Sequence, residues 1–379
     1  MKQTAIFPGR YLQAEGAMGS LAEEVQRLGT NALVVAGGAA ARTLVPRHLS
    51  AWRERIAVAV ERFGGECSDE EIRRLTGTAQ SQRCDVVVGM GGGKVTDTAK
   101  AVGHAVGARV AIVPTIASSD APTSAVAVIY TSDGVFQRCL YLPRNPDLVL
   151  VDTRVIAEAP VRFLVAGMGD ALATHFEAES CRLAYAPNEC GGMGTLAGYA
   201  LARLCYDTIL EYGVAARMAC QQKVVTPALA HVVEANTLLS GLGFESGGLA
   251  AAHSIHNGLT RLEATHAYLH GEKVAIGVLA GLFLTDQPGR VVREVYGFCE
   301  SVGLPTTLKD IGLGEASDDD LRKVAEAACA ERETIHHEPC PVSPDAVVAA
   351  LRTADRFGQD RTDRLDRFSG AGTANARGR

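Results

Sequence analysis

The sequence has few aromatic residues and no excess of positive charge. Phe, Trp and Tyr make up 5% of its 379 residues, and only one residue is Trp. The 37 lysines and arginines are outnumbered by 43 aspartates and glutamates, which gives a formal net charge of −6. Such a chain has no field that would attract nucleic acid or an anionic membrane surface. We therefore expect neither kind of partner.

Long apolar runs and closely spaced cysteine pairs are also missing. No apolar segment approaches the roughly 20 residues that a membrane helix requires. The ten cysteines are scattered without a C-x-x-C pair, and the start of the sequence lacks the pattern of a cleavable signal peptide. These features predict a globular protein of the reducing cytoplasm.

The first part of the chain alternates strand and helix patterns. Apolar strand patterns cover residues 32–36, 85–88, 109–113 and 147–152, and helical patterns cover about 47–63 and 69–82. This alternation predicts an α/β domain with a parallel, doubly wound sheet. Alternating Val126, Val128 and Tyr130 predict a hairpin arm beside it.

From residue 153 onward the strand patterns give way to helical ones. Leu201, Leu204 and Thr208 repeat at helical spacing, and residues 291–302 form an amphipathic pattern that ends at Gly303. We predict three regions. They are an α/β dinucleotide-binding domain at 1–158, an all-helical metal- and substrate-binding domain at 159–360, and a flexible tail at 361–379.

A glycine cluster at residues 89–93 follows an apolar strand and precedes a helical pattern. Glycines let a backbone approach a pyrophosphate, and the free N–H groups at a helix start favour its charge. The cluster matches neither G-x-G-x-x-G nor the P-loop pattern. A phosphate site and a tight structural turn explain it equally well.

Two histidines, His253 and His256, lie three residues apart in a helical pattern and so share one helix face. His270 follows, and Asp170 lies far upstream in a Gly-Asp-Ala stretch. Two imidazoles and one carboxylate would leave a coordination position open, as a catalytic metal site requires. A pair of histidines with no metal is the commoner explanation of this spacing alone.

These motifs occur together in the order typical of one enzyme family. By them the chain resembles, over nearly its whole length, the glycerol dehydrogenases of the metal-containing, iron-type alcohol dehydrogenase family. The matching stretches are Gly91-Gly92-Gly93-Lys94, Asp97-Thr98-Ala99-Lys100, Pro114-Thr115, Asp120-Ala121-Pro122, Gly169-Asp170-Ala171, Glu245-Ser246-Gly247-Gly248, His253-Ser254-Ile255-His256-Asn257-Gly258 and His270-Gly271-Glu272-Lys273.

The resemblance implies a metal site in the cleft between the two domains. Asp170, His253 and His270 would hold Zn²⁺, or Fe²⁺ as in other branches of the family. Both histidines would also lie against the substrate. His256 would be a catalytic residue that relays protons or supports the ligands, with a buried structural histidine as the alternative.

The resemblance also assigns the substrate side. Asp120 would contact a polyol hydroxyl as a catalytic and binding residue, and Phe244 would line the same pocket. The alternative is that Asp120 only caps a turn before Pro122. The implied reaction is reversible hydride transfer between a nicotinamide cofactor and a small polyol or related secondary alcohol, of the glycerol to dihydroxyacetone type.

The implied cofactor is NAD, with NADP as the alternative, and the family commonly forms homo-oligomers such as octamers. For Lys94 and Asp97 a solvated helix start or a capping role competes with cofactor binding. The implied cofactor contacts are Gly91, Gly92, Gly93, Lys94, Asp97, Thr115, Ser118, Val126, Val128 and Tyr130.

Other functions share this architecture. Dehydroquinate-synthase-like cyclases and glycerol-1-phosphate dehydrogenases bind phosphorylated substrates and carry basic residues around the metal. Here the segment around His253 is apolar and the loop at Asp120 is acidic, which disfavours a phosphate. A non-catalytic nucleotide sensor is the alternative of a different class.

One position departs from the family pattern. NAD-preferring folds usually place Asp or Glu after the strand beside the adenosine ribose, where it repels a 2′-phosphate. The family's glycerol dehydrogenases have an Asp there, whereas this chain has Gly37 and Gly38, followed by Arg42. We therefore predict a weaker preference for NAD. The alternative is a simple turn with Arg42 in solvent.

Overall fold

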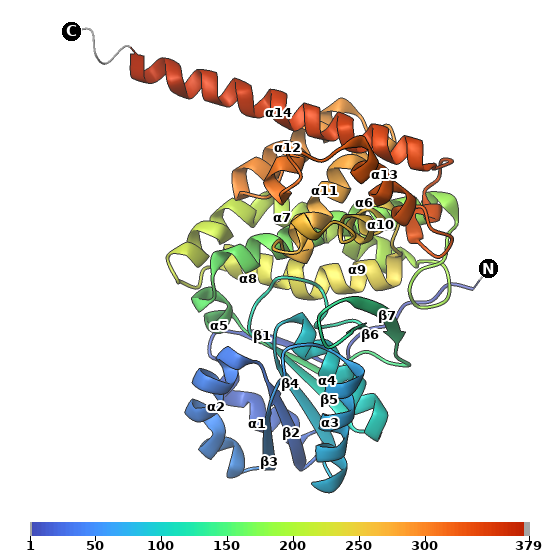
Figure 1. Ribbon diagram of the computed structural model, residues 1–379. Helices are drawn as coiled ribbons and strands as arrows, with labels where there is room; N and C mark the ends of the chain where they lie inside the picture. The colour runs from blue at the N-terminus through green and yellow to red at the C-terminus, as the bar shows by residue number, and fades with distance from the viewer. Residues whose placement is uncertain (1, 375–379) are drawn as a thin grey trace.

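The computed structural model describes residues 2–374, which form an α/β region and a helical region stacked on it (Figure 1). The α/β region comes first in the chain and carries a six-stranded parallel sheet. From Thr153 to Ala374 the named elements are all helices. This confirms the predicted fold class. The division into domains at residues 158 and 159, between α5 (Thr153–Glu158) and α6 (Val161–Ala184), stays a prediction.

The six strands run parallel in the order β1-β8-β5-β4-β2-β3. They are β1 (Tyr11–Ala14), β2 (Asn31–Ala36), β3 (Ala57–Arg62), β4 (Val86–Gly91), β5 (Arg109–Pro114) and β8 (Leu148–Asp152). The predicted hairpin is confirmed as an antiparallel pair of β6 (Val126–Tyr130) and β7 (Phe136–Tyr141), which lies between the sheet and the helical region (Figure 1).

The sheet is buried on both faces, which explains its continuous apolar strands. In β2, Ala32 and Val34 pack in one apolar cluster with residues of α1 and α2, whereas Leu33 and Val35 pack in a second cluster with residues of α3 and α4. The second cluster continues into the helical region. The four helices are α1 (Leu21–Gln26), α2 (Gly38–Arg53), α3 (Asp69–Ser81) and α4 (Gly93–Val106).

The predicted helix over residues 47–63 is confirmed only up to Arg53 and is wrong beyond it. Helix α2 begins at Gly38 and ends at Arg53, and the next stretch forms β3, which pairs with β2 along its whole length. The alanines at positions 57 and 59 favour a helix intrinsically. Pairing with the buried strand β2 overrides that preference, because strand formation depends on cross-strand packing.

Nine α-helices follow α5 in the described part of the chain. The last of them, α14, continues past residue 361 to Ala374, where the sequence predicts a flexible tail. Residues 375–379 of that predicted tail lie outside the described residues. No helix within residues 2–374 has the length and apolar character to cross a membrane. The helices are α6 (Val161–Ala184), α7 (Leu196–Gln221), α8 (Pro227–Glu234), α9 (Ser240–Gly247), α10 (Ala251–Leu259), α11 (His270–Leu284), α12 (Gly289–Val302), α13 (Asp318–Ala328) and α14 (Pro344–Ala374).

Candidate metal centre and active site

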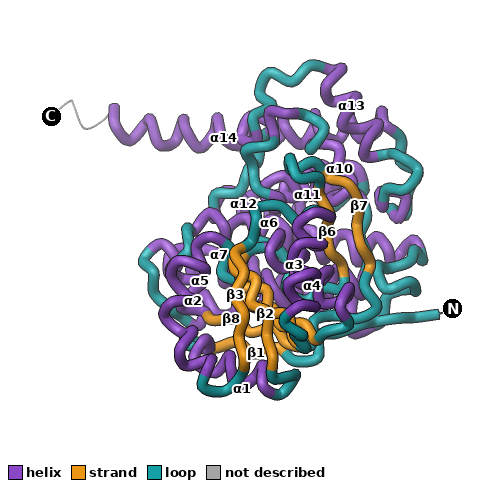
Figure 2. Tube along the Cα trace, turned by 60° about the horizontal axis from the view of Figure 1, so that its bottom comes forward, coloured by secondary structure: helices purple, strands orange, loops and turns teal. Residues whose placement is uncertain are grey.

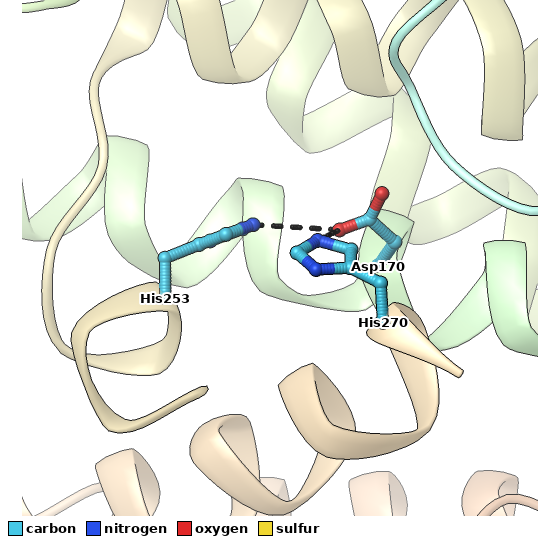
Figure 3. A group of neighbouring side chains, drawn as sticks. All are labelled: Asp170, His253 and His270. Carbon is cyan, nitrogen blue, oxygen red and sulfur yellow. Dashed lines mark hydrogen bonds and ion pairs between the residues drawn. The ribbon is translucent and has the colours of Figure 1, made fainter. Parts of the chain in front are cut away.

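Three helices bring Asp170, His253 and His270 together. Asp170 lies within α6, His253 in the first turn of α10, and His270 is the first residue of α11. The Nε2 atoms of His270 and His253 lie 3.1 and 3.4 Å from Oδ1 of Asp170, as Figure 3 shows. One ligand atom from each residue lies within 4.8 Å of the others. Asp170 is 1% exposed, whereas 40% of the His270 side chain is accessible.

Glu177 fixes the orientation of His253. Its Oε2 lies 2.6 Å from Nδ1 of His253, and its Oε1 accepts hydrogen bonds from the backbone N–H groups of Ala250 and His253. A carboxylate can only accept, so His253 Nδ1 carries a proton, which leaves Nε2 as the nitrogen that a metal would bind. Nε2 faces Asp170, as metal ligation requires.

A second chain of hydrogen bonds holds His270. Glu333 accepts from the side-chain amide of Asn257 at 2.9 Å, and Oδ1 of Asn257 lies 3.1 Å from Nδ1 of His256. Nε2 of His256 lies 3.0 Å from Nδ1 of His270. Read in order, these contacts place a proton on Nδ1 of each ring. Nε2 of His270 is then also free as a ligand.

This donor set fits a divalent cation. Two imidazole lone pairs and a carboxylate oxygen converge, and each imidazole has its other nitrogen held by a hydrogen-bonding partner, an arrangement typical of metal-ligating histidines. Burial by itself would raise the pKa of Asp170, but the charges of His270 and His253 and their hydrogen bonds outweigh it and hold that pKa well below its usual range. The carboxylate is therefore ionised and available as a ligand.

The histidines differ in their electrostatic surroundings. Burial would lower the pKa of His253, but Glu177 and Asp170 outweigh burial and raise that pKa. Burial, together with the nearby His270 and Lys273, lowers the pKa of His256 well below its usual value. His256 is therefore neutral, as its position between two other polar side chains requires. Because His256 contacts Nδ1 of His270, the nitrogen that faces away from Asp170, it acts through His270 on the triad of Asp170, His253 and His270.

Two buried carboxylates set the position of α10. Glu177 accepts from the N–H groups of Ala250 and His253, and Glu338 accepts from that of Ala251 at 2.9 Å. Carboxylates at a helix start satisfy free donors and interact favourably with the helix dipole. The chain enters α10 through Gly248, whose φ of 117° disfavours any side chain.

Asp120 links the α/β region to the triad. It lies in the loop after β5, and its backbone N–H donates to Oδ2 of Asp170 at 3.2 Å. Its side-chain Oδ2 accepts from the Ser240 hydroxyl at 3.1 Å. Burial, and then the negative charge of Asp170, raise the pKa of Asp120. The predicted substrate carboxylate thus borders the predicted metal ligands. The other predicted pocket residue, Phe244, is 8% exposed within α9, and its substrate contact stays a prediction.

The glycine loop at the end of β4 is shaped for close approach. A Cβ on Gly91 would lie 2.6 Å from Val95, and one on Gly92 would lie 2.8 Å from Ile116. Gly92 is the N-cap of α4 and no side chain caps the helix there. The cramped backbone at a helix start fits a pyrophosphate, and larger residues would close it. Gly93 opens the helix itself.

Lys94 and Asp97 have partners within the protein. Lys94 pairs with Glu66, and its Nζ lies 5.1 Å from the centre of the Tyr130 ring. Asp97 is buried, forms an ion pair of 2.8 Å with Lys100, and accepts from the backbone of Val128 at 3.1 Å. These contacts favour a role in holding the hairpin on α4. Cofactor binding by either side chain stays a prediction.

The remaining predicted cofactor residues lie around the glycine loop. Thr115 donates its backbone N–H to Gly91, and Ser118 is partly exposed in the loop that follows β5. Along β6 the partly exposed Val126, Val128 and Tyr130 alternate with buried Ala127 and Ile129. Val126 and Val128 therefore share one face of the strand, whereas a register shift between Ile129 and Tyr130 interrupts the alternation and Tyr130 packs against the buried cluster of the hairpin.

The comparisons with known proteins agree with this geometry. The family model described as iron-containing alcohol dehydrogenase matches residues 8–153. The glycerol dehydrogenase of Thermotoga maritima is 61% identical over 361 residues, which cover 95% of this chain and 99% of that protein. The chain belongs to the iron-containing alcohol dehydrogenase family. It is therefore an alcohol dehydrogenase-type oxidoreductase, and membership implies NAD(P) and a divalent metal.

Solved structures of the family share the whole fold. The crystal structure of glycerol dehydrogenase from Schizosaccharomyces pombe superposes with a TM-score of 0.91 at 36% identity, covering 96% of this chain and 93% of that one. That of a probable glycerol dehydrogenase from Sinorhizobium meliloti 1021 gives a TM-score of 0.88 at 44% identity, covering 95% and 100%. The chain thus shares the fold of these members over nearly its whole length.

A cavity of about 720 Å³ lies beside the triad, not on it. Glu333 lines it, together with Tyr141, Glu189 and His337. Through Asn257 and His256, Glu333 is connected to His270 by the chain of hydrogen bonds described above. In this family member a polar path therefore runs from the triad to the cavity.

Glu177 and Ser240, which contact the candidate site residues, were not predicted from the sequence. Glu177 lies seven residues after Asp170 on α6. Thr174 lies between them, and its hydroxyl is 2.9 Å from that of Ser240. Polar residues spaced by four and seven positions share a helix face, so this spacing within an apolar helix was a usable signal. Ser240 had no such signal, since only the tertiary fold brings it to Asp120.

Proposed function

We propose that this protein is a metal-dependent glycerol dehydrogenase that oxidises glycerol reversibly with a nicotinamide cofactor. One observation carries the proposal: the loop that holds Asp120 and covers the glycine loop is hydrogen-bonded to Asp170, the carboxylate between His253 and His270. The names of the relatives described above support glycerol as the substrate, and they favour a dehydrogenase over a cyclase.

The residues of the candidate site have separate roles. Asp170, His253 and His270 would hold the metal, which when bound supplies Lewis-acid polarisation of a substrate oxygen. NAD(P), when bound over Gly91–Gly93, supplies the hydride acceptor. Asp120 would accept a hydrogen bond from a second hydroxyl of the polyol and orient the reacting carbon. Ser240 holds that carboxylate in place.

His256 supports the reaction from behind the triad. It keeps His270 in the tautomer whose Nε2 is free, and with Asn257 it connects the site to Glu333. This contact supports a positioning role, with proton relay toward the cavity as its further consequence. A matched pair of variants, His256→Gln and His256→Ala, separates the two roles, since glutamine can hydrogen-bond His270 but cannot carry a proton between two nitrogens.

We propose zinc as the metal, because two imidazoles and one carboxylate with an open position are typical of catalytic zinc. Iron suits the same set. We further propose a homo-oligomer in the cytoplasm. Helix α7 exposes Leu196, Leu204 and Met218, which supports contacts between subunits, and all ten cysteines are unpaired, which supports a reducing compartment.

The test is a substrate panel with purified protein. Glycerol, other vicinal diols, amino alcohols and glycerol phosphates are compared with NAD and with NADP, after metal analysis and with Zn²⁺ or Fe²⁺ restored. We expect vicinal diols to give the highest kcat/KM and phosphorylated substrates to give little turnover. A protein that binds nucleotide but turns over no alcohol would be a sensor, and the proposal would be wrong. Light scattering gives the oligomeric state.

A further inference from the structure

The edge of the sheet next to the glycine loop carries two arginines and no carboxylate at the turn. Strand β2 lies beside β3, as Figure 2 shows, and pairs with β4 on its other side. Ala36, the last residue of β2, is level with Arg62 of β3 and Met90 of β4. Gly37 donates its N–H to Met90, and a Cβ on it would lie 3.7 Å from Gly91. The turn after β2 is therefore joined to the glycine loop.

This place has a known meaning in dinucleotide-binding sheets. A pyrophosphate on the glycine loop puts the adenosine ribose beside the end of the neighbouring strand. There an acidic residue hydrogen-bonds the ribose hydroxyls of NAD, whereas an arginine accommodates the 2′-phosphate of NADP. Here the turn is Gly37-Gly38, and the first turn of α2 contains no acidic residue.

Two guanidinium groups meet over this turn from different elements. The position that a Cβ would take on Gly38 lies 3.3 Å from Nη1 of Arg42, on α2, and 4.0 Å from Nη2 of Arg62, at the end of β3. Both side chains are exposed. Two like charges repel at such separations, and an anion between them removes that cost. A forked guanidinium is well suited to phosphate.

The carboxylates of this edge are engaged elsewhere. Glu61 pairs with Arg74 at 2.6 Å, Glu71 pairs with the same arginine at 2.8 Å, and Glu66 pairs with Lys94. Within the described side chains, no ion pair joins Arg42 or Arg62 to an acid. The positive charge over Gly38 is therefore left for a ligand.

We propose that Arg42 and Arg62 bind the 2′-phosphate of NADP, so that the enzyme uses NADP as well as NAD. The inference rests on the proposed function for the nature of the cofactor site, and it names the residues that set its selectivity. The 2′-phosphate would take the place that an aspartate occupies in an NAD-selective site. Gly37 and Gly38 leave that place open.

The first experiment measures kcat/KM for NADP and for NAD with glycerol. We expect the ratio for the wild type to be at least about one tenth. Arg42→Ala and Arg62→Ala should each lower this ratio about ten- to hundredfold, since each removes a charge-assisted hydrogen bond. Gly38→Asp should lower it at least as much, because it places a carboxylate between the guanidinium groups. Arg53→Ala is the matched control, an exposed arginine at the far end of α2.

A binding measurement without turnover makes the test independent of the reaction. Calorimetry compares 2′,5′-ADP with 5′-AMP, which differ by the 2′-phosphate. We expect the wild type and Arg53→Ala to bind 2′,5′-ADP more tightly than 5′-AMP. In the double variant Arg42→Ala/Arg62→Ala the two nucleotides should bind equally well. Equal binding of both probes, or a preference of NAD over NADP beyond tenfold, would overturn the inference and leave the glycerol dehydrogenase intact. Selective binding of 2′,5′-ADP without any alcohol turnover would overturn the proposed function instead.

Discussion

Glu177 and His253 form the shortest contact around the triad, 2.6 Å between Oε2 and Nδ1. The same carboxylate also accepts the backbone N–H groups of Ala250 and His253. One buried side chain therefore sets the start of α10, the direction of the imidazole and its tautomer.

We expect Glu177→Gln to weaken metal binding by about ten- to hundredfold, because a partner of a metal-ligating histidine has effects of that size. The amide of glutamine would point a donor at one of the groups that need an acceptor. Zn²⁺ affinity is measured by competition with a chelator. Glu179→Gln, two residues along α6 in an exposed ion pair with Arg182, is the control. Equal affinities in the two variants would reject the role of Glu177.

Removal of the metal should abolish turnover and His270→Ala should prevent its restoration. His270 contributes one of the three donor atoms, and two remaining ligands leave a weak site. The protein is stripped with a chelator, assayed with glycerol, and assayed again after addition of Zn²⁺. His266→Ala, an exposed histidine four residues earlier, serves as the control. Full activity of the stripped protein would show that these residues do not hold a catalytic metal.

We expect Asp120→Asn to lower kcat/KM for glycerol by about ten- to hundredfold, because the amide can turn a donor toward the polyol hydroxyl, and an unpaired buried polar group costs about 1–3 kcal/mol. The effect should be smaller for a mono-alcohol such as 2-propanol, which lacks the second hydroxyl. Steady-state kinetics with both alcohols measure the difference. Asp133→Asn, exposed in the hairpin turn, is the control. If Asp120→Asn behaves as the wild type with both alcohols, the side chain only shapes the loop.

Glu338 should make the protein less stable as the pH rises from about 4.5 to about 7. Burial raises its pKa to about 7, against hydrogen bonds from Ser180 and Ala251 that lower it. In the unfolded chain this carboxyl ionises at lower pH than in the folded state. The free energy of unfolding therefore falls between pH 4.5 and pH 7, because above pH 7 the folded state contains an ionised buried carboxylate. The difference amounts to about 3 kcal/mol for a shift of this size.

Urea unfolding at pH 5 and pH 8 tests this dependence. Glu338→Gln keeps the hydrogen bonds and cannot ionise, so the wild type should lose stability relative to this variant between the two pH values. Glu326→Gln, exposed on α13, should follow the wild type. A constant difference between Glu338→Gln and the wild type would mean that Glu338 ionises at its ordinary pH.

The elements with one dominant local pattern could be predicted from the sequence alone. The buried strands at 32–36 and 109–113, the hairpin of Val126 to Tyr130 and the helix at 69–82 are encoded by apolar runs or periodicity in neighbouring residues. Some of the candidate site residues were also predictable, because His253 and His256 lie three residues apart in a helical pattern and the glycine cluster lies between a strand pattern and a helical one.

Tertiary structure decided what depends on distant partners. Strand β3 forms because β2 offers a paired edge, which the alanines at 57 and 59 do not reveal. Asp170, His253 and His270 come together only when three helices pack, since these residues are separated by up to 100 positions in the sequence. The tautomers of both imidazoles are set by Glu177 and His256 across such packing, and Arg62 reaches Arg42 only through the register of two strands. Local sequence determines which element forms and what it carries, whereas long-range burial and hydrogen bonding decide which side chains meet.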